Sequence, residues 1–302
     1  MNGQLDGAAQ QMVELGEGRQ ATFEVAGSGP PMFWFEGGPG LSARLSRPEA
    51  RLLSDSFAVY LVDPHGSGGS TSPVDAMQYD HIGHARFYDT VRRALGLDHV
   101  TIAGISFGGT VALTYASMFP EATVRCLAVS AYALGTEVDE GEAAAEMELM
   151  LSRHAGAPWY PDARKTWDGW TDRVLAAVDP EEVDEMLREV LPLYLAYPDR
   201  SDVRAIVESA RKEVRMNLAA VKAWEGGLYQ GIDLRPLLAK IIRPTLVVAG
   251  ELDIIGGPAQ ARQIAQGVAG ADLAIIPDCG HIPAWEAPEQ FKAILLDWCS
   301  TH

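Results

Sequence analysis

Cysteine is scarce in this sequence of 302 residues, which contains only Cys126, Cys279 and Cys299. A small and odd number of cysteines does not fit a disulfide framework and is typical of proteins from a reducing compartment. No run of about 18 apolar residues occurs, so no membrane span is expected. The N-terminal stretch MNGQLDGAAQQMVELGEG has neither a basic start nor an apolar core, unlike a signal peptide. We therefore expect a cytoplasmic protein.

Basic residues are also few. The sequence has 24 Lys and Arg against 41 Asp and Glu, which gives a net charge of −17. Phosphate groups are bound by basic surfaces, so nucleic acids and anionic membranes are not expected partners. Hydrophobic residues make up 47% of the chain. This length and composition support a large core, in one domain or in one domain with an insertion.

Short apolar runs alternate with helical patterns in the first half of the chain, which predicts βαβ units and a parallel sheet. Helices are expected from about Tyr79 to Leu95 and directly after Ile105. The predicted strands are Ala21–Gly27, which alternates like an edge strand, Pro31–Phe35, Phe57–Asp63, His99–Gly104 and Val124–Tyr132.

Only helical patterns follow, from roughly Thr136 to Gly226, before strands return at Pro244–Gly250 and Asp272–Asp278. We therefore predict an α/β fold with a mostly parallel central sheet and a helical cap inserted after the sixth strand. The core would comprise residues 1–134 and 227–302, and the cap residues 135–226. Within the cap we expect one helix at 161–178 and a longer one at 201–225.

The segment GISFGG, Gly104–Gly109, fits the pattern G-x-S-x-G and stands between a predicted strand and a predicted helix. A sharp turn at this place lifts the serine hydroxyl above the sheet, and the following helix directs its N–H groups toward the oxygen. Because the pattern alone also occurs by chance, its position after a strand carries the prediction that Ser106 is a nucleophile.

A serine hydroxyl needs a base to become a good nucleophile. His281 is the best placed of the seven histidines, because it follows the last predicted strand. Asp253 follows the preceding strand, with Glu251 as the weaker alternative. Each of these residues alone could be an ordinary loop residue. Together, Ser106, Asp253 and His281 have the order of an α/β-hydrolase catalytic triad.

The stretch FWFEGGPG joins a predicted strand to a glycine-rich loop. Acyl transfer develops negative charge on the carbonyl oxygen, and two backbone N–H groups are expected to stabilise it. One comes from Phe107, the residue after the nucleophile, and the other from the glycine loop, where we assign it to Gly37. Gly38 would lie against the substrate.

Five segments in order, FEGGPG, DPHGSGGS, GISFGG, GELD and DCGHIPAWEAPEQF, resemble the motifs of proline iminopeptidase-like serine peptidases, the prolyl aminopeptidase family of α/β-hydrolases. The resemblance covers the α/β core at both ends of the chain. It implies Ser106 as nucleophile, His281 as general base and acid, Asp253 as the residue that orients it, and oxyanion donors from Gly37 and Phe107. It also implies a peptidase that removes an N-terminal residue, often proline, and needs no metal or organic cofactor.

Two positions depart from this family pattern: Glu36 replaces a histidine, and His65 stands where arginine is usual. Glu36 could brace the oxyanion loop, bind a cationic group of the substrate, or be tolerated without a role. We favour bracing, because a residue at the base of a loop usually supports that loop.

The peptidases of this family hold the free amine of the substrate with acidic residues, mainly from the cap. Glu225, in AVKAWEGG, is the best candidate here, with Trp224 beside it as a further substrate contact. An ordinary glutamate at a helix end explains Glu225 equally well. Most cap aromatics should form the cap core, with one or two of them lining the pocket: Trp159, Tyr160, Trp167, Trp170, Tyr194, Tyr197 and Trp224.

The leading hypothesis is therefore a cofactor-free, metal-free serine hydrolase of a small molecule or short peptide. The departure at Glu36 leaves the choice between an N-terminal amide and an ester or lactone open. An acyltransferase or cyclase using the same site is an alternative, and a non-catalytic receptor is a third. An aspartate nucleophile is disfavoured because residue 106 is serine. The oligomeric state and the pathway are not indicated.

Overall fold

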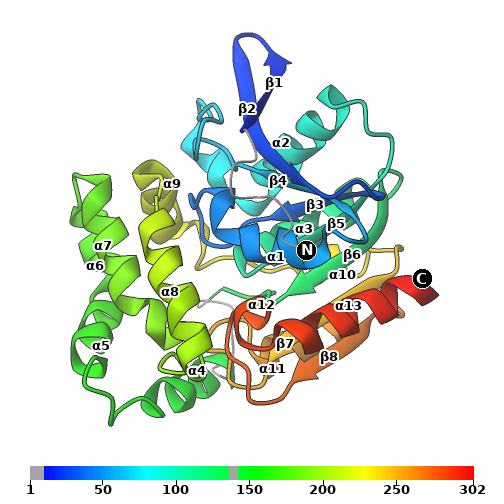
Figure 1. Cartoon of the computed structure of the whole chain (residues 1–302). Coiled ribbons are helices and arrows are strands. Elements are labelled where there is room, and N and C mark those ends of the chain that lie inside the picture. The colour runs from blue at the N-terminus through cyan, green and yellow to red at the C-terminus, as the bar shows by residue number, and fades with distance from the viewer. Residues whose placement is uncertain (1–9, 136–141) are drawn as a thin grey trace.

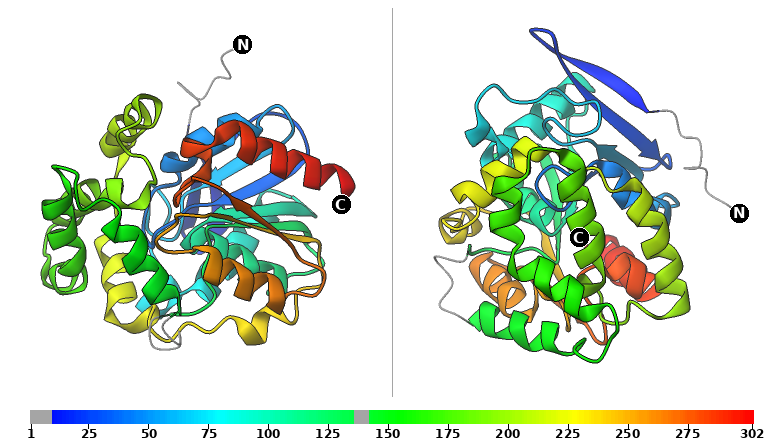
Figure 2. Two further views of the ribbon diagram at one scale, coloured as in Figure 1. Left: turned by 90° about the horizontal axis from the view of Figure 1, so that it is seen from below. Right: turned by 90° about the vertical axis from the view of Figure 1, so that its left-hand side faces the viewer.

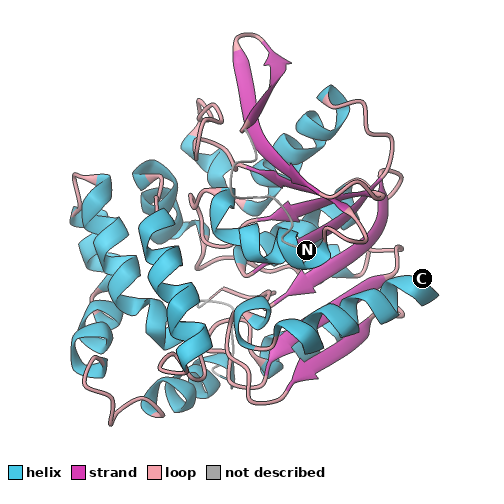
Figure 3. Cartoon of the chain, in the orientation of Figure 1, coloured by secondary structure: helices cyan, strands magenta, loops and turns pink. Residues whose placement is uncertain are grey.

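A mixed sheet forms the centre of the molecule (Figures 1 and 3). The computed structural model describes residues 10–135 and 142–302. The sheet has eight strands in the order β1-β2-β4-β3-β5-β6-β7-β8, with β3 to β8 mutually parallel and β2 antiparallel to both of its neighbours. The strands are β1 (Gln11–Gly16), β2 (Arg19–Ala26), β3 (Pro31–Phe35), β4 (Ala58–Val62), β5 (Val100–Ile105), β6 (Thr123–Val129), β7 (Thr245–Gly250) and β8 (Asp272–Ile276).

Helices cover both faces of the sheet, and each face has its own apolar core. One core packs α2 (His81–Ala94), α3 (Phe107–Met118), α10 (Arg235–Leu238) and α11 (Pro258–Gly267) against the strands. The other packs α1 (Arg47–Leu53), α12 (Pro283–Glu286) and α13 (Pro288–Thr301). Coverage on both sides explains why β5 reads VTIAGI and is buried at every position.

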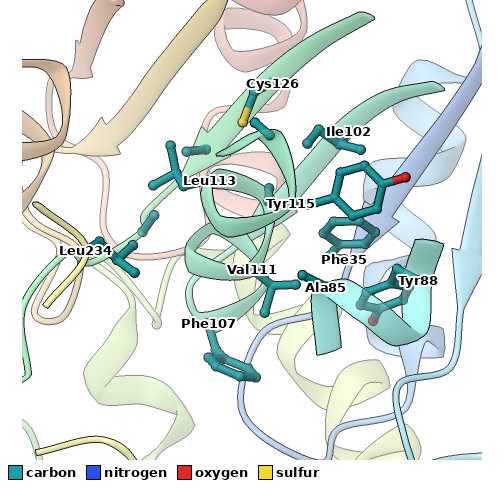
Figure 4. Packing of buried hydrophobic residues seen from close by; sticks show 14 of the residues in the cluster. Phe35, Ala85, Tyr88, Ile102, Phe107, Val111, Leu113, Tyr115, Cys126 and Leu234 are labelled. Carbon is teal, nitrogen blue, oxygen red and sulfur yellow. The ribbon is translucent and has the colours of Figure 1, made fainter. Parts of the chain in front are cut away.

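The first of these cores holds the strand that leads into the site. Phe35, the last residue of β3, stacks on Tyr88 of α2 with ring centroids 4.0 Å apart, and Tyr115 of α3 lies against the same ring (Figure 4). Phe107 begins α3 at the lower end of this cluster in the figure. The aromatic packing thereby fixes the end of β3 and the start of α3 relative to each other.

A group of helices separates β6 from β7, and we call α4 to α9 the inserted helices. They lie beside the sheet, on the side to which the arrowheads of β6 and β8 point (Figures 1, 2 and 3). Except for α8, they pack around a core of their own, whereas α8 packs into the core that holds α1, α12 and α13. Their bounds are α4 (Glu142–Ser152), α5 (Tyr160–Asp168), α6 (Trp170–Ala176), α7 (Pro180–Val190), α8 (Ser201–Glu213) and α9 (Leu218–Ala223).

The structure confirms the predicted α/β fold, with helices inserted after the sixth strand. The division into a core and a cap at residues 134 and 226 stays a prediction, and residues 136–141 of that cap lie outside the described residues. Within the described part of the chain, no helix is long and apolar enough to cross a membrane.

Three local predictions were wrong. The stretch at 21–27 is not an edge strand, because β1 pairs along its outer side. The helix predicted at 161–178 is two helices, since Gly169 ends α5 and precedes α6. The long helix predicted at 201–225 breaks after α8, where Asn217 starts α9 with its side-chain oxygen accepting from the Ala220 N–H. A competing local cap can end a helix that apolar periodicity would continue.

Candidate active site

Ser106 occupies the turn between β5 and α3 in a strained backbone conformation, with φ 56° and ψ −124°. A non-glycine residue at positive φ costs free energy and persists where the surrounding structure enforces it. Here α3 approaches the end of β3 so closely that a Cβ on Gly108 would lie 2.1 Å from the Phe35 carbonyl oxygen. The glycine is therefore required for the turn that presents the Ser106 side chain.

His281 and Asp253 lie together at the carboxyl ends of the last two strands. His281 Nδ1 is 2.8 Å from Asp253 Oδ1, and the two residues are 4% and 1% exposed. Asp253 Oδ1 also accepts a hydrogen bond from the backbone N–H of Ile255 at 2.8 Å. The backbone N–H of His281 donates to the carbonyl oxygen of Tyr194 at 2.7 Å. These contacts orient the imidazole ring and leave Nε2 for a partner on the other side.

A cavity of about 420 Å³ brings most of the predicted site residues together. Ser106 and His281 both line it, and Asp253 lies behind His281 rather than in the wall. The other predicted residues in the wall are Glu36, Gly37, Gly38, Phe107, Trp224 and Glu225. The size and the mainly apolar wall are typical of sites for small molecules.

The Gly37 N–H is already engaged: it donates to Oε1 of the preceding residue, Glu36, at 2.7 Å. Its predicted role as an oxyanion donor would require this hydrogen bond to open. The loop nevertheless reaches the serine, because a Cβ on Gly37 would lie 3.3 Å from the Ser106 Cβ. The contact between Glu36 and Gly37 agrees with the interpretation that Glu36 braces the loop.

A second buried carboxyl group, which the sequence did not reveal, lies in the same wall. Glu49 stands in the first turn of α1 and is 2% exposed, while Glu36 is 6% exposed. Burial raises the pKa of Glu36 to about 7 and that of Glu49 to about 8, and the negative charge of Glu36 adds to the second shift. The sequence around Glu49, RPEARLL, is that of an ordinary helix start, so no local signal marked it.

The carboxylate of Glu225, predicted to hold a substrate amine, already has two donors from the inserted helices. Its Oε1 accepts from Trp170 Nε1 at 2.8 Å, and its Oε2 accepts from the Thr171 hydroxyl at 2.7 Å. This side chain therefore joins α6 to the segment that follows α9. It lines the cavity, and each of its two oxygens already accepts one hydrogen bond from the protein.

More aromatic residues line the cavity than the one or two expected. Four of the predicted set do so, namely Trp167, Trp170, Tyr194 and Trp224. Their rings come from α5, α6, the turn after α7, and the end of α9. The expectation failed because the inserted helices turn an aromatic face toward the sheet as well as toward each other.

His65, at the position where the resembling family has arginine, packs in an aromatic cluster and carries no charge near neutral pH. Its ring centroid lies 4.1 Å from that of Phe87 and 5.6 Å from that of His84. Burial lowers the pKa of His65 to about 3 and that of His84 to about 4. These two rings therefore support the start of α3 by packing, since His84 lies edge-on to Phe107.

Among residues 10–135 and 142–302, no group of three or more His, Cys, Asp or Glu side chains is placed to hold a metal ion.

Comparison with known proteins gives the family. The model of the alpha/beta hydrolase fold family matches residues 30–288. The chain belongs to this family. The predicted α/β-hydrolase fold and the expectation of an enzyme of the hydrolase class are confirmed. Membership in this family does not decide whether the chain is a proline iminopeptidase, because relatives of several specificities match.

Two relatives illustrate this range. A 2-hydroxy-6-oxononadienedioate/2-hydroxy-6-oxononatrienedioate hydrolase of Klebsiella pneumoniae is 25% identical over 291 residues, covering 94% of this chain and 88% of that protein. A proline iminopeptidase of Lactobacillus delbrueckii is 23% identical over 289 residues, covering 89% of each.

Solved structures show the same fold at lower identity. An enol-lactonase from Burkholderia xenovorans superposes with a TM-score of 0.71 at 20% identity, covering 95% of this chain and 99% of that one. An alpha/beta fold family hydrolase from Bacillus anthracis gives a TM-score of 0.75 at 19% identity, covering 96% and 99%.

Proposed function

We propose that this α/β-hydrolase is a serine hydrolase of a small ester or amide, with Ser106 as nucleophile, His281 as general base and acid, and Asp253 as the residue that orients the histidine. The observation that carries the proposal is the buried hydrogen bond between His281 Nδ1 and Asp253 Oδ1 at 2.8 Å, in a cavity that Ser106 also lines.

The chemistry follows from these groups. His281 Nε2 takes the proton of the Ser106 hydroxyl while the oxygen attacks the substrate carbonyl carbon. The imidazolium then gives this proton to the leaving alcohol or amine, and an acyl-enzyme remains. Water attacks the acyl group with His281 again acting as base, which releases the acid and restores the serine. Asp253 keeps the proton of the imidazole on Nδ1 and stabilises the imidazolium.

We assign the oxyanion donors to the Phe107 and Gly38 N–H groups. Phe107 follows the nucleophile at the N-terminus of α3, where the helix dipole favours negative charge. Both glycines line the cavity, and Gly38 is preferred to Gly37 because the Gly37 N–H already donates to Glu36. Glu36 then braces the loop from behind through Gly37.

The charges around the cavity argue against an anionic substrate. Among the described residues that line it, none is Lys or Arg, whereas Glu36, Glu49 and Glu225 are acidic. The Klebsiella relative is named for a dioate, which carries two carboxylates. A dianion would find no Lys or Arg partner among these residues, so we propose a neutral or cationic substrate instead.

Covalent labelling tests the proposed nucleophile without knowledge of the substrate. The wild-type protein is treated with an alkyl fluorophosphonate, and the adduct is located by mass spectrometry of peptides. We expect one adduct, on Ser106, and none in Ser106→Ala. Ser117→Ala is the matched control, because Ser117 lies further along the same helix and should not affect labelling. A folded wild-type protein that is not labelled would refute the proposal.

Turnover is then measured as kcat/KM on a matched set of substrates. The set holds a prolyl and an alanyl arylamide with free amines, the same two compounds N-acetylated, and a short acyl aryl ester. Activity on free amines alone would make the enzyme an aminopeptidase, and activity on the ester alone would make it an esterase or lactonase. Labelling of Ser106 without turnover of any member would contradict hydrolysis of small esters and amides.

A further inference from the structure

Two carboxyl groups from different elements line the same cavity as the serine, and they are close enough for the charge of one to raise the pKa of the other. Glu36 follows β3, and Glu49 belongs to α1; both line the cavity together with Ser106. Both side chains are more than nine-tenths buried. Gly37 lies against Ser106, and Glu36 is the residue directly before Gly37 in the chain.

Each of these carboxyl groups has an oxygen without a partner. Within the described part of the chain, neither Glu36 Oε2 nor Glu49 Oε2 has a hydrogen-bond partner. The hydroxyl and N–H of Ser46 lie near Glu36 and favour its ionised form, without making a well-formed hydrogen bond to Oε2. A buried carboxylate oxygen with no donor is costly, and such atoms in native proteins require an explanation.

Within the part of the chain that the structure describes, the cavity wall holds no Lys or Arg to neutralise this pair. The further charged group near Glu36 is Asp63, which is also acidic. Tyr88 faces Glu36 as well and is neutral, because burial raises its pKa further above the ordinary value. The negative charge of each glutamate makes ionisation of the other less favourable. A hydrogen-bond donor from a ligand would stabilise both carboxylates.

Glu225 gives the contrast. It is also acidic and lines the cavity, but Trp170 and Thr171 already donate to its two oxygens. A ligand cation at Glu225 would have to share these oxygens with the donors already bound to them. Among the described residues that line the cavity, the carboxyl oxygens without any donor are therefore Glu36 Oε2 and Glu49 Oε2, and the neutral amide oxygen of Gln230 is a further free acceptor.

We propose that Glu36 and Glu49 together form a subsite for the ammonium group of the substrate. The proposal rests on the proposed function in that it places this group beside the acyl carbon attacked by Ser106. A primary ammonium has three N–H donors, enough for the two free oxygens, and the apolar wall suits a carbon skeleton attached to it. Trp285 Nε1, buried and without a partner among the described residues, offers a donor for a carbonyl oxygen of the same ligand.

Direct binding tests this subsite without any turnover. Isothermal titration calorimetry compares hexylammonium chloride with the neutral isostere hexan-1-ol on the wild-type protein at about pH 8.5. Charge-assisted hydrogen bonds are about twice as strong as neutral ones. We expect hexylammonium to bind at least about tenfold more tightly than the alcohol. Its affinity should fall as the pH is lowered through about 8 to 6, because the carboxyl groups take up protons while the amine stays charged.

Variants assign the effect to residues. Glu49→Gln and Glu36→Gln should each reduce hexylammonium affinity by about tenfold and leave hexan-1-ol nearly unchanged. Both replacements remove a buried ionisable group and keep its shape, so the fold should persist. Glu289→Gln controls for the loss of one surface charge, since Glu289 is exposed. Glu225→Gln discriminates between the two possible cation sites.

Three results would overturn the proposal. One is equal affinity for the ammonium and the alcohol in the wild-type protein. Another is unchanged ammonium affinity in both Glu36→Gln and Glu49→Gln. The third is a loss that occurs only in Glu225→Gln. Fluorophosphonate labelling separates the two hypotheses: binding of hexylammonium without labelling of Ser106 would contradict the catalytic proposal alone.

Discussion

Asn217 Nδ2 donates a hydrogen bond to the carbonyl oxygen of Gly66 at 2.7 Å, and this contact joins the inserted helices to a loop of the sheet core. The Asn217 N–H also donates to the Gly40 carbonyl oxygen at 2.9 Å, in the glycine loop beside Ser106. Its Oδ1 begins α9 by accepting from the Ala220 N–H at 3.1 Å. Asn217 thus starts a helix and ties it to two loops, to the Gly66 loop through its side chain and to the Gly40 loop through its backbone N–H.

Asn217→Asp should separate these two roles, because aspartate keeps the helix-starting oxygen and loses the donor to Gly66. We expect Asn217→Ala to lower the free energy of unfolding by about 1–2 kcal/mol, and Asn217→Asp to lower it less. Both should speed hydrogen exchange in the Gly66 loop. Urea unfolding and exchange measured by mass spectrometry check this, and protection equal to wild type in both variants would contradict the link.

Ser106 should stabilise the protein less than glycine would at the same position. Its φ of 56° is strained for a residue with a Cβ, and Ser106→Ala keeps this strain while Ser106→Gly removes it. Both variants should lose labelling and turnover. We expect Ser106→Gly to be more stable than Ser106→Ala by about 1 kcal/mol. Thermal unfolding compares the two, and equal stability would mean that the turn stores no strain.

Asp253→Asn should leave the fold intact and reduce activity strongly. The amide can present an N–H to His281 Nδ1 in place of an acceptor, which favours the wrong imidazole tautomer. We expect kcat to fall by about 10³-fold or more, with a smaller change in KM. Steady-state kinetics on the best substrate of the matched set measures this. A loss below tenfold would show that Asp253 does not orient the catalytic base.

Glu286 holds the loop that carries His281 against the inserted helices. Its Oε1 accepts from the Gly280 N–H at 3.0 Å, and its Oε2 accepts from the Ala196 N–H at 2.7 Å. Glutamine can accept at only one of these places, so Glu286→Gln should lower stability by about 1–3 kcal/mol. It should also lower kcat by displacing His281, whereas exposed Glu289→Gln should change neither. Unchanged kcat in a destabilised Glu286→Gln protein would leave Glu286 with a structural role only.

The stability of the protein should fall as pH rises from about 6.5 to 8. Burial raises the pKa of Glu49 to about 8 and those of Glu36 and Glu286 to about 7. The folded protein therefore binds more protons than the unfolded chain in this interval, and ionisation favours unfolding. His65 and His84, whose pKa values burial lowers, oppose this decrease near pH 6.5, because the unfolded chain still binds protons at these residues there; above about pH 7.5 they no longer contribute.

Glu49→Gln removes the largest of these titrations. Over 1.5 pH units, Glu49 accounts for about 2 kcal/mol of the decrease in the free energy of unfolding. The variant should therefore lose less stability than the wild type between pH 6.5 and 8, measured by urea unfolding at both values. An equally steep decrease in the variant would show that Glu49 is not protonated in the folded state.

The features that the sequence determined by itself are local ones. A continuous apolar run such as VTIAGI, followed by a sharp glycine-containing turn and a helix, is decided by neighbouring residues, so β5, Ser106 and α3 were predictable. The order of Ser106, Asp253 and His281 was also readable, because each follows a strand and parallel strands end at one edge of a sheet. The α/β fold follows from the same alternation.

What only the tertiary structure decided is how distant segments meet. Glu49 starts a helix like many exposed glutamates, and only the packing of α1 against β4 and α12 buries it near Glu36. The carboxylate of Glu225 accepts hydrogen bonds from Trp170 and Thr171, which lie more than fifty residues away in the chain. Burial and hydrogen-bond partners depend on contacts between separate elements, and local periodicity carries no information about them.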